Sequence, residues 1–520
     1  MSIKKTVSTR ENARGSVSAS GGASVPAAGA TSCSRRGFVA GATAAVGAFA
    51  AMAGAAYADE AADTSDLAPL PVKYATRLLI IGGGLAGFSA GLRVLELGET
   101  DVLIIDKASG EGGDWGGSSY VCGGSYLAPV SDSEEDAAAY AQAIYKKGLE
   151  RCNMDLITAL ANGSYRGLEW LKGQGVVYED PTSVFPAYPE VLTSVADMPS
   201  AMETLRSNYL ANGGKLVYGT KAHRLNIDTQ GVCGVLASDA EGYFTISADK
   251  MLLCTGGYPA NKQFLEDHIG ENGTTLMCRA RSSATGDGIA MAQAVGGVTV
   301  GSVGLRSVHL SAVDPVAVAK GQPGNQIPFF VAINSEGKRF VDEALGSVRH
   351  GQAVFQLDVP RDGLVTDSKV LDDIQGVLDK LHGQGVETWQ VDTLDEMAEI
   401  FGCPADALKA TIEEFNAHVQ DDGTTQGLAV DKTAKALTID TPPYYGLYPL
   451  VPGCSLTYGG LRIDTSAHVL QADGSPVPNL FAAGEGTGDF FYDDYFGGSC
   501  MSRCVVFGHI AAETAIAEMA

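Results

Sequence analysis

Charged residues are scarce in this 520-residue sequence, and basic residues are scarcer than acidic ones. Only 19% of the chain is charged, and 36 Lys and Arg stand against 61 Asp and Glu, for a formal net charge of -25. A chain this acidic repels phosphate backbones and anionic lipid surfaces, so we expect no nucleic acid partner. Its 65 glycines and 45% hydrophobic residues are typical of a folded α/β enzyme, whose length allows about three domains.

The ten cysteines show none of the spacings that hold a metal ion or a haem. The sequence contains no Cys-x-x-Cys, no Cys-x-x-Cys-His and no paired zinc spacing. Cys500 and Cys504 are the nearest pair, one helical turn apart. We therefore predict no metal site, and we interpret most of the thiols as buried apolar groups.

Long runs of Leu and Ile are missing from the N-terminal region, although residues 38–56 form a mild apolar run of mostly Ala and Gly. The twin arginine Arg35-Arg36 precedes this run, and Ala56-Tyr57-Ala58 ends it with the small-x-small form of a signal-peptidase site. A single transmembrane anchor is the alternative, but the composition of the run argues against it.

We predict a twin-arginine signal peptide over residues 1–58 and a polar linker over 59–74. The protein is then exported, usually with its cofactor already loaded, to the periplasm or the outer face of the cytoplasmic membrane. We expect no stable membrane span in the mature chain.

A strand–turn–helix pattern rich in glycine begins near residue 78. Gly82, Gly84 and Gly87 follow an apolar strand, and Asp106 closes the next one, 19 residues after Gly87. These glycines let the backbone turn tightly and approach a pyrophosphate at a helix N-terminus, and the acid suits a ribose hydroxyl. The pattern predicts a Rossmann-like domain for an adenine dinucleotide, either NAD or FAD.

Later segments favour FAD over NAD. A glycine-serine loop at residues 116–124 suits a pyrophosphate and ring system, and Glu485 at a strand end suits ribityl hydroxyls. Alternating runs between residues 215 and 249 predict a small antiparallel insert. The cofactor-binding residues that we predict from these segments are Lys107, Gly117, Ser118, Gly123, Gly124, Thr255, Gly256, Gly257, Asp287 and Glu485.

These segments, in this order, resemble the fumarate reductase flavoprotein family with its relatives urocanate reductase and 3-ketosteroid dehydrogenase. The resemblance covers nearly all of the chain after the leader and includes AINSEGKRFVDE at residues 332–343. It implies an α/β fold with a discontinuous FAD-binding domain over 75–309 and 441–520. An α+β capping domain is inserted at 310–440, and the substrate is held between cap and flavin.

The resemblance also implies that the last helix begins at the flavin. Its first residues, Ser499, Cys500 and Met501, would offer free N–H groups to the ring, and a helix N-terminus stabilises the anionic reduced flavin.

The family's dicarboxylate-binding residues are missing. Where dicarboxylate-reducing members have an arginine before a Gly-Gly pair, this chain has Tyr495, and Ser455 replaces their histidine. The position of their proton-donating arginine falls on Ser347, and only His309 is kept. Enclosing a dianion without cations costs several kcal/mol per ion, so we do not expect fumarate or succinate as substrates. The cations that remain as alternatives are Arg306, Arg349 and Arg462.

Two tyrosines point to a carbonyl substrate. Ketosteroid dehydrogenases also carry a tyrosine before the glycine turn and another in a YYPE-like segment, which matches Tyr188 in FPAYPEV. A phenol with a pKa near 10 can donate a hydrogen bond to a carbonyl oxygen and polarise an enone. The family's third tyrosine is missing at Ser347, so Arg349 or His350 is an alternative proton donor. The alternative for both tyrosines is simple packing.

We therefore predict an FAD-dependent oxidoreductase acting on a C=C or CH–CH bond conjugated to a carbonyl. Because NADH is unavailable outside the cytoplasm, electrons would come from a quinol- or cytochrome-linked donor in anaerobic respiration. The small-molecule substrate would be a steroid-like or aromatic enone. Two alternatives remain: a 3-ketosteroid-type dehydrogenase working in the oxidative direction, and a flavin-loaded electron-relay or binding protein.

Overall fold

The computed structural model describes residues 70–179, 191–301, 307–310 and 321–520. The predicted signal peptide, Tyr188 and Arg306 lie outside the described residues. Within the described part of the chain, no helix is both long and apolar enough to cross a membrane.

The larger region is built on an eight-stranded sheet in which five neighbouring strands are parallel. Strand β1 lies at its centre, and its last four residues, Leu78–Ile81, are buried beneath the helices. Continuous apolar runs of this kind are expected where both faces of a parallel sheet are covered. The strands along the sheet are β17 (His468–Leu470), β18 (Pro476–Ala482), β8 (Gly242–Leu253), β1 (Val72–Ile81), β2 (Val102–Ile105) and β5 (Lys215–Val217).

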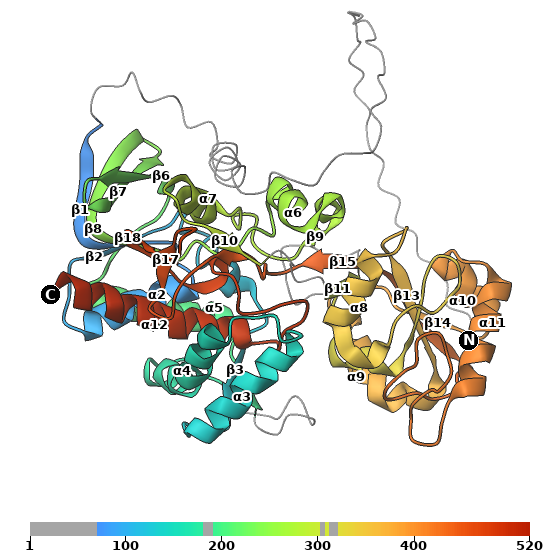
Figure 1. Cartoon of the computed structure of the whole chain (residues 1–520). Helices are drawn as coiled ribbons and strands as arrows, with labels where there is room; N and C mark the ends of the chain where they lie inside the picture. Colours follow the sequence, from blue (N-terminus) through green and yellow to red (C-terminus); the bar gives the residue numbers. More distant parts are fainter. Residues whose placement is uncertain (1–69, 180–190, 302–306, 311–320) are drawn as a thin grey trace, which may run out of the picture. The chain divides into compact units, whose positions relative to one another are not determined.

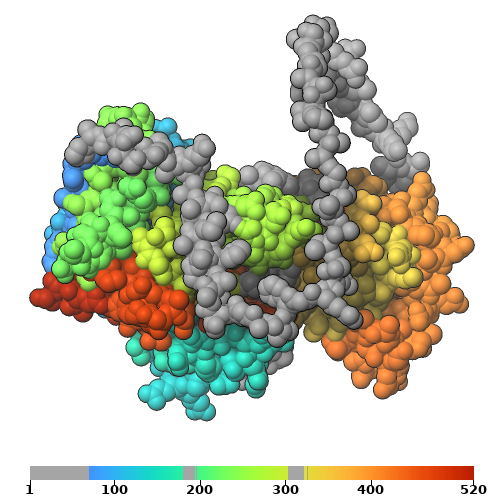
Figure 2. Space-filling model, turned by 45° about the horizontal axis from the view of Figure 1, so that its top comes forward, coloured from blue at the N-terminus to red at the C-terminus, as the bar shows by residue number. Residues whose placement is uncertain are grey.

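The antiparallel insert predicted between residues 215 and 249 is present. Strands β6 (Lys221–Asp228) and β7 (Gly231–Asp239) form a hairpin that pairs with the first half of β8. The Asn479 side chain of β18 donates to the Val232 carbonyl of β7 at 3.2 Å, which ties the insert to the C-terminal part of the sheet. Figure 2 shows these green and orange-red segments side by side.

Two helices from opposite ends of the chain, α2 (Leu85–Glu96) and α12 (Ser499–Met519), pack together (Figure 1). Gly508 makes this possible, because a Cβ there would lie 2.9 Å from the Ala86 carbonyl oxygen.

The remaining elements of this region are β3 (Ser125–Pro129), α3 (Glu134–Lys147), α4 (Met154–Gly173), β4 (Val191–Val195), α5 (Met198–Ala211), α6 (Lys262–Ile269), β9 (Met277–Cys278), α7 (Asp287–Ala294), β10 (Thr299–Val300) and β16 (Gly460–Leu461).

A second, six-stranded sheet is centred on β15 (Tyr444–Cys454). Its other strands are β9, β11 (Ser307–Leu310), β12 (Val331–Ile333), β13 (Asp362–Asp367) and β14 (Trp389–Val391). It crosses both boundaries predicted for the capping domain, 310 and 440, so those boundaries stay predictions.

Both faces of this second sheet are buried. Leu364 joins one apolar cluster and its neighbour Val365 joins another, as expected where successive side chains point to opposite faces. The helices of this region are α8 (Gly346–Phe355), α9 (Leu371–Gly383), α10 (Leu394–Phe401) and α11 (Ala405–His418).

Candidate active site

A cavity of about 950 Å³ opens where the parallel strands end, close to the upper size of typical cofactor and ligand pockets. Ligands of doubly wound α/β sheets bind at this edge. Fourteen of the seventeen predicted cofactor residues line it: Gly82, Gly84, Asp106, Lys107, Gly117, Ser118, Gly123, Gly124, Thr255, Gly256, Asp287, Glu485, Cys500 and Met501.

The other three lie directly behind the cavity wall. A Cβ on Gly87 would overlap the carbonyl oxygen of Gly82, so this glycine lets α2 approach the turn that precedes it. A Cβ on Gly257 would collide with the carboxylate of Glu485. Ser499 is buried and donates its hydroxyl to the Phe496 carbonyl at 2.6 Å. These residues shape the wall and do not face the cavity.

Three helices that reach the cavity begin at a glycine without a side-chain cap. They are α2 after Gly84, α7 after Gly286 and α12 after Gly498. By contrast, the side chains of Ser133 and Asn153 cap α3 and α4, away from this site. At α2 the Leu85 N–H already donates to the Ser119 hydroxyl at 3.1 Å. Free N–H groups at a helix start and the helix dipole attract anionic or electron-rich ligand groups, which suits a pyrophosphate and a reduced flavin ring.

The glycines of the wall leave room for a cofactor. An added Cβ on Gly123 or Gly256 would meet no atom within 4 Å, so both backbones border open space. At the end of β2, the Asp106 carboxylate accepts hydrogen bonds from the N–H groups of Gly83 (2.7 Å) and Ala108 (2.8 Å). The residues present therefore fit an adenine dinucleotide with a bulky ring.

Glu485 is buried at the wall beside the first turn of α12. Its Oε1 accepts the backbone N–H of Thr457 at 3.0 Å. Burial, and next the nearby Cys500, raise the pKa of Glu485 to about 8. A carboxyl group that is largely protonated at neutral pH can both donate and accept hydrogen bonds, as ribityl hydroxyls require.

Tyr495 lines the cavity on the loop before α12. Its ring packs against Phe491 and Tyr458, with centroids 5.4 and 5.8 Å away. Its hydroxyl makes no hydrogen bond to another described residue. Burial, followed by the acidic groups around it, raises the pKa of this phenol, so it stays protonated at neutral pH and can act as a hydrogen-bond donor.

Ser347 on α8 also lines the cavity, whereas Arg349 and His350 on that helix do not. Arg349 forms ion pairs with Asp493 and, at 3.4 Å, with Asp494. His350 is fully buried, and its Nε2 lies 2.6 Å from the Asp362 carboxylate. Both possible proton donors are therefore paired with carboxylates, and neither lines the cavity.

Two of the predicted catalytic residues have no described side chain. His309 lies on β11, where the structure describes the backbone only, and Tyr188 falls outside the described residues. Their roles stay predictions.

Lys147 and Asp494 are wall residues that sequence reasoning missed. The Lys147 ammonium lies 2.8 Å from the Asp494 carboxylate, which is almost completely buried. Lys147 ends the amphipathic helix α3, and nothing in that local pattern distinguishes it from a surface lysine. For Asp494, the sequence signal that could have indicated a place in the wall is its position next to Tyr495.

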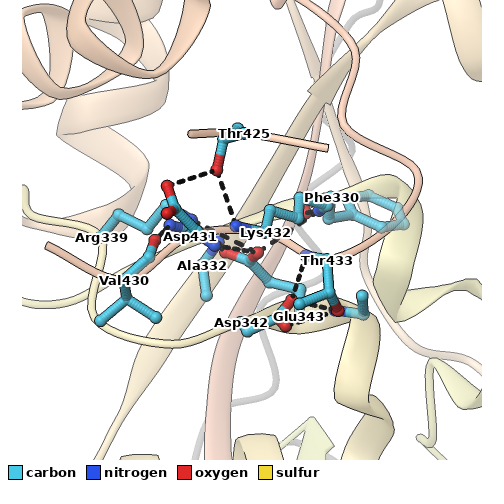
Figure 3. A network of polar contacts seen from close by, with 11 residues as sticks. Phe330, Ala332, Arg339, Asp342, Glu343, Thr425, Val430, Asp431, Lys432 and Thr433 are labelled. Carbon is cyan, nitrogen blue, oxygen red and sulfur yellow. Dashed lines mark hydrogen bonds and ion pairs between the residues drawn. The ribbon is translucent and has the colours of Figure 1, made fainter. Parts of the chain in front are cut away.

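A buried polar network fixes the segment that leads to Ser347 (Figure 3). The Glu343 carboxylate accepts hydrogen bonds from Arg339 (2.9 Å) and from the Ala332 N–H (2.8 Å), and it lies 3.4 Å from the Lys432 ammonium. Although burial opposes its charge, Lys432 and Arg339 lower the pKa of Glu343. Arg339 and Glu343 belong to the GKRFVDE motif, and Lys432 comes from a distant loop.

The sequence matches the family described as FAD binding domain over residues 77–492. A probable fumarate reductase of Shewanella frigidimarina is 26% identical over 457 residues, which span 85% of this chain and 74% of that protein. A urocanate reductase of Eggerthella lenta is 27% identical over 473 residues, which also span 85% and 74%.

A solved structure of a 3-ketosteroid-delta4-(5alpha)-dehydrogenase from Rhodococcus jostii is similar in fold, with a TM-score of 0.67 at 21% identity. The match covers 87% of this chain and 98% of that one. The chain thus belongs to the FAD binding domain family and is an FAD-dependent oxidoreductase of the fumarate reductase and urocanate reductase type.

Proposed function

We propose that the protein reduces a C=C bond conjugated to the carbonyl group of a neutral, bulky substrate. The observation that carries this proposal is Tyr495, a protonated phenol with a free hydroxyl on the cavity wall. A hydrogen bond from this hydroxyl to the substrate's carbonyl oxygen would draw electron density from the double bond and make its β-carbon electrophilic.

FAD, when bound and reduced by the electron donor, would supply the hydride to the β-carbon. The uncapped start of α2 would hold its pyrophosphate, Asp106 a ribose, and Glu485 with the start of α12 the ring end. Of the described residues, Tyr495 and Ser347 are the two hydroxyl-bearing residues that we propose contact the substrate. Tyr495 would stabilise negative charge on the carbonyl oxygen, and Ser347 would pass the proton to the α-carbon.

The cations of the wall support the neutral character of the substrate. Among the described wall residues, the Lys107 ammonium pairs with Asp287 at 2.8 Å and the Lys147 ammonium pairs with Asp494 at 2.8 Å. Arg281 donates to the Gly113 carbonyl oxygen. A dicarboxylate would have to compete with Asp287 and Asp494 for the two lysines, which leaves Arg281 as the described wall cation without a carboxylate partner.

Two of the three arginines that the sequence leaves as alternatives, Arg349 and Arg462, do not line the cavity. Arg349 is held by Asp493 and Asp494, and Arg462 is exposed and does not line the cavity. The similar ketosteroid dehydrogenase structure is a complex with 4-androstene-3,17-dione, which is a neutral ketone.

Export and the electron donor belong to the same proposal. The twin-arginine leader, the acidic chain and the absence of NADH outside the cytoplasm favour a quinol- or cytochrome-linked donor. A positively charged cytochrome would be attracted to a protein with a net charge of -25.

The proposal is tested by anaerobic turnover with a reduced viologen dye over a panel of neutral enones, ketosteroids, acrylates and dicarboxylates. We expect turnover of neutral enones or ketosteroids and none of fumarate. A saturated ketosteroid with an oxidising dye tests the second candidate, a ketosteroid-type dehydrogenase, which the tyrosine before the glycine pair also favours. Turnover of dicarboxylates alone would contradict the proposal, and no turnover of any compound would favour an electron-relay protein.

A further inference from the structure

The first turns of α12 carry a buried guanidinium next to a thiol of the cavity wall. Arg503 is fully buried, and its Nη2 lies 3.3 Å from the sulfur of Cys500, which lines the cavity. Its Nη1 donates to the Thr487 carbonyl at 3.0 Å. The rings of Phe490 and Phe491 lie 5.2 and 5.1 Å from the guanidinium carbon. Among the described residues, no carboxylate forms an ion pair with Arg503.

Burying a guanidinium without an anionic partner costs free energy. We therefore consider which acidic group near Arg503 can carry a compensating negative charge. Two groups lie on its own helix, Cys500 and Cys504. Glu485 approaches from the preceding strand end, and Cys122 comes from the loop at residues 116–124, with its sulfur 3.8 Å from the Met501 sulfur on α12. Asp494 and Tyr495 lie on the loop before the helix, and Asp494 already pairs with Lys147 and Arg349.

Of these groups, Cys500 is the best counterion for Arg503. Glu485 bonds to the Thr457 N–H, and its raised pKa leaves it largely protonated at neutral pH. Cys500 touches the guanidinium directly and is the second residue of a helix with no side-chain cap. A helix N-terminus and an adjacent arginine both stabilise a thiolate.

We propose that Cys500 is a thiolate in the native protein, held by Arg503 and the start of α12, and that it lies against the bound flavin and lowers the flavin's reduction potential. The proposal rests on FAD binding and is independent of the proposed substrate. The hydrogen bond from Cys504 lowers the pKa of Cys500, burial opposes this, and Arg503 lowers it further. In this arrangement Cys504 keeps its proton.

The spectrum of the oxidised holoenzyme reports such a contact. A thiolate against an oxidised flavin produces a long-wavelength charge-transfer band beyond the flavin's own absorption. We expect this band in the wild type, with a titration midpoint below the ordinary cysteine pKa of about 8.5. Cys500→Ser should abolish the band. Cys122→Ser is the matched control and should keep it, because burial raises the pKa of the Cys122 thiol to about 11.

Two further measurements separate a thiolate from a merely structural cysteine. Arg503→Gln should move the midpoint of the band to higher pH, because the thiolate loses its counterion. Cys500→Ser should raise the midpoint potential of the flavin, because it removes a negative charge and leaves the guanidinium unpaired.

Alkylation of the wild-type apoprotein needs no variant and gives an independent readout. Iodoacetamide should modify Cys500 first, with a rate that levels off below about pH 8.5, and added FAD should protect it. A wild type without a pH-dependent band, a band that survives in Cys500→Ser, or alkylation of Cys500 unaffected by FAD would overturn the proposal. If the enzyme does not turn over enones but shows the pH-dependent band, the proposed function is contradicted and the proposed thiolate stands.

Discussion

The side chain of Tyr495 is set up to donate a hydrogen bond and not to ionise. Aromatic neighbours hold its ring, its hydroxyl has no protein partner among the described residues, and its surroundings raise its pKa. A tyrosinate that shuttles protons would need the opposite shift. The hydroxyl is therefore suited to polarising a carbonyl group, and its contribution is separable from the packing of the ring.

We predict that Tyr495→Phe keeps its flavin but loses turnover by about a hundredfold or more, the usual effect of removing one donor to a developing oxyanion. The phenylalanine ring fills the same space, so FAD content and thermal stability should match the wild type. Steady-state kinetics on the enone found in the panel, normalised to bound flavin, measure the effect. Full activity in the flavin-replete variant would reduce Tyr495 to a packing residue.

The open backbone of Gly123 allows a test of the cofactor site without damage to the fold. A Cβ added at this position meets no protein atom within 4 Å, and the residue lines the cavity. We predict that Gly123→Leu remains folded by circular dichroism and loses FAD, whereas the wild type releases about one FAD per chain on acid treatment. Gly376→Leu on α9, where an added Cβ also meets nothing, should retain full FAD. Equal flavin content in both variants would place FAD elsewhere.

At the scale of elements, the structure joins the start of α8 to distant parts of the chain. Arg349 and Gln352 on this helix bind Asp493, two residues from Tyr495. The Glu343 network secures the segment before the helix. Charged groups at and behind the wall thus hold the segments of both hydroxyls proposed to contact substrate, and Arg349 would act as a positioning residue that does not line the cavity.

Lys432 is the member of this network whose loss should be most costly. It is buried and donates to the Phe330 carbonyl at 2.5 Å as well as to Glu343. We predict that Lys432→Met lowers the free energy of unfolding by about 3–5 kcal/mol, because it strips one partner from a buried charge cluster. Lys409→Met, which removes an exposed pair with Asp395, should cost less than about 1 kcal/mol. Urea unfolding compares the two, and equal losses would contradict this role of the network.

Helix α12 also carries a group that makes the fold sensitive to acid. His509 packs its ring edge-on to Trp170 at 4.4 Å, and burial, aided by Arg93, lowers its pKa to about 3. Between about pH 6.5 and about pH 3, His509 binds a proton in the unfolded chain but not in the folded chain, so the free energy of unfolding falls as the pH drops.

The slope due to His509 should be about 1.4 kcal/mol per pH unit within that window. We predict that His509→Phe flattens this part of the stability profile, whereas His382→Phe at an exposed position leaves it unchanged. Melting curves at several pH values measure both. An unchanged profile in His509→Phe would show that other groups dominate acid unfolding.

Over the whole molecule, the sequence predicts features that depend on neighbouring residues, and it does not predict features that depend on contacts between distant parts of the chain. The turn at Gly82 to Gly87 and the acid at Asp106 are local patterns, and the structure brings them to one cavity. The presence of two regions, each built around its own sheet, was predicted from the family resemblance and not from local patterns. Other residues matter because of burial or because of partners that are distant in the sequence, as for Lys147, Lys432 and Arg503. The sequence around each of them does not differ from that around an ordinary helix or loop residue.

Hydride delivery to a carbonyl-conjugated double bond in a neutral molecule, with rejection of dicarboxylates, is the activity that we propose for this site. Reoxidation of the reduced flavin measures this in a single turnover, without a partner protein or a dye. The holoenzyme, reduced anaerobically, is mixed in a stopped-flow instrument with a neutral enone or with fumarate, and the return of flavin absorbance is followed.

We expect rapid reoxidation by at least one neutral enone or ketosteroid, slowed about a hundredfold in Tyr495→Phe, and no measurable reoxidation by fumarate. Rapid reoxidation by fumarate, unchanged in Tyr495→Phe, would contradict the proposed activity.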